Sequence, residues 1–219
     1  MIPVTPAPEP ARFDVEVRQP GLRAIAEMVG KKPPSVRRVG RPFRKIAGRE
    51  QEIPPERFPA YWTAVLEDLM SAYDEICAYS CFRIHPVTGA GTVDHFAAKS
   101  RAWNCVYEWD NYRLACARLN AGKRDFSAVL DPFTIEPGWF QLELVGFQVI
   151  PSPSLRGRRR AAVQGTIDRL GLNDFRRARE KDAEEYWSRN VSLEKLRRES
   201  PFVAHELRRQ KRLLPGDAW

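Results

Sequence analysis

Residues 92–123 constrain the fold of this chain more than any other part of the sequence. Two short strands are predicted here, from Thr92 to Phe96 and from Tyr112 to Ala115, and the residues from Arg118 to Lys123 fit a short helix. The elements follow one another in the order strand, loop, strand and helix, and we expect them to surround one point. The rest of the chain must pack around this unit.

Four polar residues of this unit have side chains with a chemical use. Asp94 and His95 are neighbours at the end of the first predicted strand, Asn111 precedes the second, and Asn120 lies in the predicted helix. In a regular strand adjacent side chains project to opposite faces. Asp94 could therefore hold a metal ion while His95 accepts a proton from water.

This set of residues predicts hydrolysis of a phosphodiester bond. Asp94 and the amide oxygen of Asn120 supply two oxygen ligands for a hard divalent ion, which leaves positions for phosphate oxygens and water. A histidine, whose pKa is ordinarily near neutrality, suits proton transfer, so His95 is the candidate base. Asn111 is better placed to orient the histidine or to pin the loop.

Each residue also has an ordinary structural interpretation. A single histidine is more often a structural hydrogen-bonding residue, Asn111 alone would be a turn or cap residue, and Asn120 alone a helical surface residue. The joint occurrence favours a site, because the Asp-His, Asp-Asn-Tyr-Arg-Leu-Ala-Cys and Asn-x-x-Lys blocks follow one another at the spacing that such a unit requires.

The charge distribution favours a polyanionic partner. The net charge is +8, and the basic surplus lies in residues 1–56 and 151–219, whereas residues 57–150 are slightly acidic. Lys123 and Arg124 could meet phosphate groups. Surplus basic charge supports sequence-independent binding to a nucleic-acid backbone, which weakens as the salt concentration rises.

Two basic clusters are candidate nucleic-acid contacts, although such runs are more often solvated faces. One, at the entry of a predicted helix, contains Arg156, Arg158, Arg159 and Arg160, of which Arg158 and Arg159 are the candidates we name. The other lines the last segment, where glutamates are available for intrahelical pairs.

The fold class predicted is α+β, as a mainly helical domain around the small strand-strand-helix unit, with an additional short strand region and a basic C-terminal helical extension. A helix is expected over residues 55–79 and a strand over residues 138–150. Further helices are expected over residues 161–171 and 174–186, with Asn173 as the cap of the second, and from Ser192 to about Leu214.

Three parts are predicted along the chain: a Pro-rich and basic N-terminal extension (residues 1–56), a core with the candidate site (residues 57–150) and a basic C-terminal helical region (residues 151–219). Residues 1–20 are expected to be extended or poorly ordered. Neither a signal peptide nor a membrane-spanning apolar run is visible, so a cytoplasmic protein without membrane contact is expected.

The three blocks resemble the ββα-metal finger of the HNH nuclease superfamily. The resemblance implies that His95 is the general base, that Asp94 and Asn120 bind the metal, and that Asn111 supports them. It implies Mg²⁺, with Mn²⁺ as a possible substitute. The final position holds Asn120 instead of a histidine, which is a variant that the superfamily accepts.

Many members of that superfamily also carry a structural zinc ion held by two cysteine pairs. Here Cys77 and Cys81 are separated by three residues instead of the usual two, and Leu119 stands where the partner of Cys116 would be. The sequence therefore favours Cys77 and Cys81 as buried thiols over a four-cysteine zinc site.

A wider resemblance is to bacterial HNH proteins of retron-associated and Septu-type anti-phage systems. It rests on four segments: Ile76–Tyr79, Val129–Phe133, Gly138–Phe140 and Thr166–Asn173. It implies a DNA endonuclease of a bacterial defence complex with an ATPase partner. Cutting of both strands would be easiest for a homo-oligomer. The alternatives are a nucleic-acid-binding adaptor whose activity resides in a partner, and an RNase, because a hydrolytic metal site does not itself select the sugar.

Overall fold

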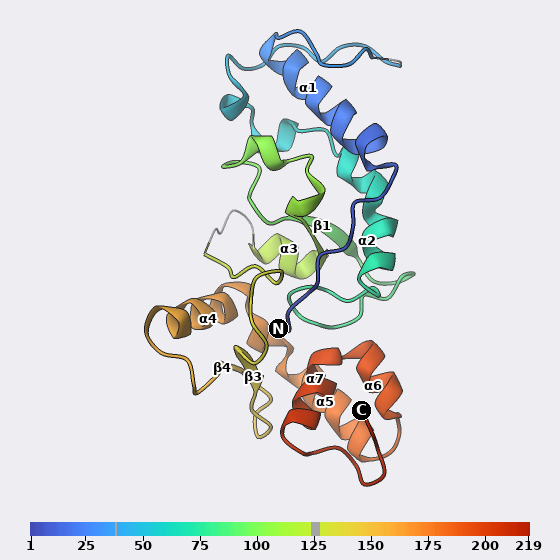
Figure 1. Cartoon of the computed structure of the whole chain (residues 1–219), viewed down its shortest axis with the longest axis vertical. Helices are drawn as coiled ribbons and strands as arrows, with labels where there is room; N and C mark the ends of the chain where they lie inside the picture. Colours follow the sequence, from blue (N-terminus) through green and yellow to red (C-terminus); the bar gives the residue numbers. More distant parts are fainter. Residues whose placement is uncertain (38, 124–127) are drawn as a thin grey trace.

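The computed structural model describes residues 1–37, 39–123 and 128–219. Within these ranges the chain forms seven α-helices and two antiparallel sheets of two strands each, which confirms the α+β class. In Figure 1 helix α1 lies at one end of the molecule and helices α5 to α7 lie at the other. The first sheet, with α3 beside it, lies between these ends.

The helices and strands have the following bounds. The helices are α1 (Gln19–Val29), α2 (Leu66–Ala72), α3 (Ala117–Lys123), α4 (Gly157–Leu170), α5 (Arg176–Trp187), α6 (Leu193–Glu199) and α7 (Pro201–Arg209). The strands are β1 (Gly91–His95), β2 (Tyr112–Cys116), β3 (Phe140–Leu142) and β4 (Val149–Pro151).

Strands β1 and β2 and helix α3 appear where the sequence predicts them. The strands pair antiparallel, from Gly91 opposite Cys116 to His95 opposite Tyr112. Helix α3 begins directly after β2 and packs against both strands. The sheet is largely buried: Val93 and Leu114, which are directly opposite each other, are 7% and 1% exposed.

The prediction of one helix over residues 55–79 is wrong. Short 3₁₀ turns lie on either side of Pro59, and only α2 has regular α-helical geometry. Proline disfavours helical geometry in the residue before it. Helix α2 then ends where Asp74 and Glu75 adopt left-handed backbone, with φ of 50° and 61°. The apolar period survives these breaks because consecutive short turns still present one face to the core.

The continuous strand predicted over residues 138–150 is a hairpin of β3 and β4. The Glu143 carboxylate organises its turn by accepting the backbone N–H groups of Val145, Gly146 and Gln148. These N–H groups bond to a side chain and not to the backbone of a neighbouring strand, so the strand ends before the turn.

Helices α4 and α5 lie where the sequence predicts them, whereas the helical stretch predicted from Ser192 to about Leu214 is divided into α6 and α7 and ends at Arg209. The break at Ser200 precedes Pro201, and proline disfavours helical geometry in the residue before it. The capping role predicted for Asn173 is wrong. Its side chain instead accepts from the backbone N–H of Val149 at 2.7 Å and donates to the Val149 carbonyl at 3.2 Å. Asn173 thus ties the segment before α5 to the edge of β4.

Residues 1–10 are extended, as expected, but they are packed and not loosely attached. The expectation is wrong for the end of this range, because Asp14–Arg18 form a π-helical turn that leads directly into α1. The backbone N–H of Val4 donates to the Pro132 carbonyl at 2.9 Å, and the indole N–H of Trp109 donates to the Ala7 carbonyl at 2.8 Å. Phe13 is fully buried against the rings of Trp109 and Tyr112. The N-terminal segment therefore covers the loop that leads into β2.

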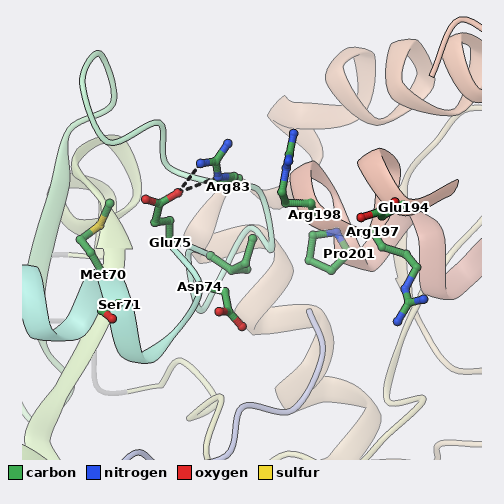
Figure 2. Close-up of a pocket in the computed structure, with 10 residues that line it drawn as sticks. Met70, Ser71, Asp74, Glu75, Arg83, Glu194, Arg197, Arg198 and Pro201 are labelled. Atoms are coloured by element: carbon green, nitrogen blue, oxygen red, sulfur yellow. Dashed lines mark hydrogen bonds and ion pairs between the residues drawn. The ribbon is translucent and has the colours of Figure 1, made fainter. Parts of the chain in front are cut away.

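The C-terminal helices meet the rest of the chain through ion pairs. Arg83 contacts the carboxylate of Glu75 at 2.6 Å and that of Glu199 at 3.0 Å. A cavity of about 670 Å³ opens beside this contact, between the end of α2 and helix α6, and Figure 2 shows the Glu75–Arg83 pair at its wall. Opposite charges face each other across it, so it does not select a ligand of one sign.

Replacement of Phe13 by alanine should destabilise the protein by about 3–5 kcal/mol, because a fully buried aromatic ring leaves a cavity when it is removed. Urea denaturation of the two proteins measures this. Val15→Ala is the matched control: Val15 lies two residues away and is 63% exposed, so its loss should change stability by less than about 0.5 kcal/mol. Equal effects of the two substitutions would contradict the packing described for the N-terminal segment.

Candidate functional site

Asp94, His95 and Asn120 line one cavity of about 310 Å³. The first two come from the end of β1 and the third from the middle of α3, so the pairing of β1 with β2 and the packing of α3 bring them together. Trp62 and Lys99 complete the wall on the other side. Residues 58 positions apart in sequence thus surround one space that is large enough for a phosphate group and water.

His95 is held in one orientation and one tautomer. Its Nε2 lies 3.0 Å from the Val106 carbonyl oxygen, which can only accept, so Nε2 carries the proton and Nδ1 carries the lone pair. The rings of Trp62 and Tyr112 contact the imidazole edge-to-face, at centroid distances of 4.6 and 5.1 Å. Nδ1 is the ring nitrogen that this contact leaves for proton transfer.

Burial, and secondarily the positive charge of Lys99, lower the pKa of His95 to about 3. The imidazole is therefore neutral at pH 7, which is the form that can accept a proton. The same desolvation makes it a weak base. The negative charge of a phosphate group bound nearby would favour the protonated imidazole and raise this pKa toward the range that proton transfer requires.

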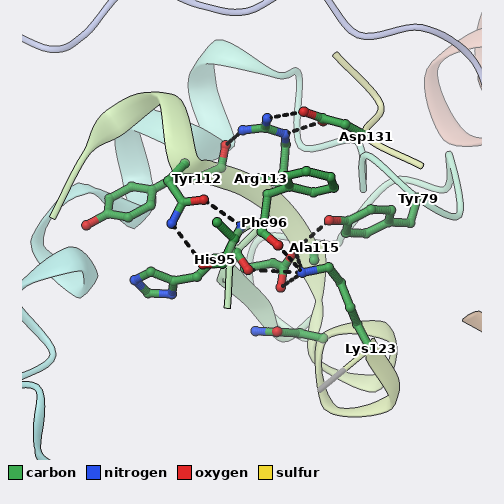
Figure 3. A network of polar contacts seen from close by, with 12 residues as sticks. Tyr79, His95, Phe96, Tyr112, Arg113, Ala115, Lys123 and Asp131 are labelled. Carbon is green, nitrogen blue, oxygen red and sulfur yellow. Dashed lines mark hydrogen bonds and ion pairs between the residues drawn. The ribbon is translucent and has the colours of Figure 1, made fainter. Parts of the chain in front are cut away.

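The carboxylate of Asp94 lies in a buried network of charged and polar groups, and Figure 3 labels two of its partners, Tyr79 and Lys123. Asp94 is 3% exposed, and its Oδ2 accepts from the Tyr79 hydroxyl at 2.5 Å. The Lys123 ammonium lies 3.1 Å from Oδ1 and 3.0 Å from Oδ2. Burial and the neighbouring carboxylate raise the pKa of Tyr79 well above its usual value, so the hydroxyl remains a donor.

Lys123 is 1% exposed and does not point to solvent. Besides Asp94, its ammonium donates to the carbonyl oxygens of His95 at 3.0 Å and Phe96 at 3.2 Å. This arrangement does not fit the phosphate contact expected from the sequence, because the donors are used inside the protein. Here Lys123 is the counter-ion of Asp94. Arg124, the other residue of that prediction, lies outside the described residues.

The amide nitrogen of Asn120 is bonded to β1. Its Nδ2 donates to the Thr92 hydroxyl at 3.1 Å and to the Val93 carbonyl at 3.4 Å. Because the nitrogen is engaged with the strand, the oxygen is the amide atom left for a ligand. This is the atom that the sequence prediction requires of Asn120.

Asn111 pins the long loop between the two strands. Its Oδ1 accepts from the backbone N–H of Ala97 at 2.7 Å, and its Nδ2 donates to the carbonyls of Ala97 at 3.1 Å and Cys105 at 2.9 Å. Asn111 does not line the cavity. It fixes the loop that carries the Val106 carbonyl, so it positions His95 indirectly, as a supporting residue.

The donor set fits one hard divalent ion with few protein ligands. A carboxylate has about four lone-pair sites, and Tyr79 and Lys123 use three of those on Asp94. One remains, together with the Asn120 oxygen and the open cavity. Mg²⁺ is commonly held by one or two protein oxygens and otherwise by water and phosphate. Over the described ranges, the chain has no group of three or more His, Cys, Asp or Glu residues placed to hold a metal.

Two of the cysteines are buried thiols, with Cys77 and Cys81 at 0% and 1% exposure. The backbone N–H of Cys116 donates to the Cys77 sulfur at 3.4 Å. A hydrogen bond from the Cys116 thiol, which outweighs the effect of burial, lowers the pKa of Cys77 to about 6. These contacts connect the segment after α2 to the end of β2.

The arginines named from the sequence lie apart from the cavity, at the start of α4. Arg159 stacks its guanidinium on the Trp139 ring at 4.9 Å, and Arg158 is exposed. Neither is among the residues that line the cavity of Asp94 and His95. Contact with nucleic acid stays a prediction for both.

Three residues of the site were not identified from the sequence. Tyr79 and Trp62 carry the apolar signal of core residues, and only their contacts with Asp94 and His95 show a second task. Lys99 stacks on the Trp62 ring at 4.5 Å. Its position four residues after His95 was the available signal, since a basic residue just beyond the acid-histidine pair lies near any phosphate bound there.

Comparison with known proteins returns no relationship: no protein-family model matches the chain, and no curated protein matches it. The site must therefore be interpreted from its own geometry. Among the helices of the described ranges, none has the length and apolar character needed to cross a membrane.

Asn111→Ala should destabilise the protein by about 2–4 kcal/mol, because three hydrogen bonds are lost and buried backbone groups are left unpaired. It should also speed proteolysis of the loop that follows β1. Chemical denaturation and limited proteolysis measure the two effects. Asn104→Ala is the control, since Asn104 is exposed in the same loop. If the two variants behaved alike, Asn111 would not pin the loop.

Proposed function

We propose that this protein is a metal-dependent endonuclease of the HNH type that hydrolyses phosphodiester bonds of DNA. One observation carries the proposal: Asp94, His95 and Asn120 line the same cavity, where the structural contacts of His95 and Asn120 engage Nε2 and Nδ2 and not the Nδ1 and Oδ1 atoms that the reaction needs. A scaffold would have no need of this convergence. The antiparallel strands followed by α3 are the architecture expected of a ββα-metal finger.

The residues of the cavity divide the chemical work. His95 accepts the proton of the attacking water at Nδ1, while Val106 holds its Nε2–H. Asp94 and Asn120 would hold a Mg²⁺ or Mn²⁺ ion, which supplies charge stabilisation for the phosphorus centre and the leaving oxygen when bound. Lys99, at the wall of the cavity, adds positive charge where the phosphate would lie.

The wider assignment rests on sequence. The resemblance to HNH proteins of anti-phage systems supports a place in a bacterial defence complex, in the cytoplasm, with an ATPase partner and further copies of the chain. The net charge of +8 supports binding to a nucleic-acid backbone. DNA is proposed as the substrate in keeping with that resemblance, and RNA is the alternative tested beside it.

One contact favours the adaptor alternative. The Asp94 carboxylate already has a full counter-charge in Lys123, so it is stable without a metal ion. A protein that kept this unit only as a scaffold would bind DNA in a salt-dependent way but would not cut it. Cleavage assays therefore decide between the two functions.

His95→Ala should reduce cleavage of supercoiled plasmid by about 100- to 10,000-fold, because the base is removed while the metal ligands remain. The assay compares Mg²⁺, Mn²⁺ and EDTA, with an RNA substrate in parallel. His85→Ala is the control, since His85 is an exposed histidine whose Nδ1 accepts from the backbone of Val87 and Thr88. Cleavage that persists in His95→Ala, or in EDTA, would refute the proposal.

A further inference from the structure

The Lys123 ammonium group is enclosed by four oxygen atoms. Both Asp94 carboxylate oxygens and the carbonyl oxygens of His95 and Phe96 lie between 3.0 and 3.2 Å from Nζ. Figure 3 shows these contacts converging on the end of the lysine side chain. An ammonium group has three protons, and here each can be used by a buried oxygen. The last residue of α3 therefore places a cation in an oxygen-lined site.

We propose that Lys123 is a built-in competitor of the metal ion for Asp94, so that the lysine sets the metal affinity of the site. The inference rests on the proposed function, because it concerns the same carboxylate. The role of Lys123 nevertheless predicts something that the nuclease function does not: the native chain should bind divalent ions weakly, and removal of the lysine charge should strengthen binding.

Lys123 and a bound metal ion would repel each other electrostatically. Asp94 carries one negative charge, and Lys123 already neutralises it at 3.0 Å. A divalent ion on the same carboxylate would lie about 5 Å from the ammonium, and repulsion at that range weakens binding by at least about tenfold at the effective dielectric of a protein. Tyr79 is a neutral donor and does not add to this repulsion.

The same geometry predicts what happens when the lysine charge is removed. Without Lys123, the buried Asp94 carboxylate would keep the Tyr79 hydrogen bond but lose its counter-charge. A buried charge without a partner is destabilising. A metal ion would then supply the missing charge, so metal binding and folding would become linked.

The test compares Mn²⁺ binding, measured by electron paramagnetic resonance and calorimetry, in the native protein, Lys123→Met and Lys123→Arg. Methionine keeps the length of the side chain without the charge, and arginine keeps the charge. The dissociation constant for Mn²⁺ should fall at least tenfold in Lys123→Met and should not fall in Lys123→Arg. Asp94→Asn in the Lys123→Met background should abolish the gain.

Thermal unfolding gives a second readout. Lys123→Met should unfold at a lower temperature than the native protein without metal, and added Mg²⁺ should raise its midpoint more than the native midpoint. If Lys123→Met does not fold, the side-chain ammonium resonance of Lys123 in the native protein is followed during Mg²⁺ titration, with Lys123→Arg giving its assignment. A shift of that resonance supports competition, and an unchanged resonance at saturating Mg²⁺ overturns it.

The outcomes separate the two claims. Equal or weaker Mn²⁺ binding in Lys123→Met, in a native protein that binds Mn²⁺ and cuts DNA, overturns the role of Lys123 alone. No Mn²⁺ binding in any variant, together with no plasmid cleavage, overturns both the competition and the nuclease. Tighter Mn²⁺ binding in Lys123→Met without cleavage supports the competition and refutes the nuclease.

Discussion

The buried pair of Asp94 and Lys123 is the interaction on which the site depends. It connects the end of β1 to the last residue of α3, and through the carbonyls of His95 and Phe96 it also fixes the chain that follows β1. Breaking such a pair on one side typically costs about 3–5 kcal/mol, because a charge is left buried without compensation. The strands and α3 therefore keep their relative positions as long as both residues are present.

The neighbouring residues Asp94 and His95 lie in different environments. Asp94 lies among donors, where its charge is satisfied by Lys123 and Tyr79. His95 lies between aromatic rings, and its Nε2 contacts the Val106 carbonyl. Adjacent residues of one strand thus place a carboxylate and a neutral imidazole at the same cavity. This division is what a hydrolytic site needs.

The order of the elements around the site could be predicted from sequence, because alternation and helical period act over a few residues. The positions of β1, β2 and α3 along the chain followed from these signals. Long-range partners could not be predicted. Nothing local to Lys123 shows that its ammonium is buried against Asp94, and nothing local to Tyr79 shows that its hydroxyl reaches the same carboxylate. The prediction of one helix over residues 55–79 is wrong because apolar periodicity does not indicate the backbone breaks near Pro59 and Asp74.

We propose that Asp94 and Asn120 hold one divalent ion beside His95. Anomalous diffraction from crystals of the native protein soaked in Mn²⁺ would locate such an ion. One strong peak is expected in the cavity, at about 2.2 Å from an Asp94 oxygen and from the Asn120 amide oxygen, since such ions bind oxygen ligands at about this distance. A cavity without a peak at saturating Mn²⁺, with Lys123 still bonded to both Asp94 oxygens, would contradict the claim.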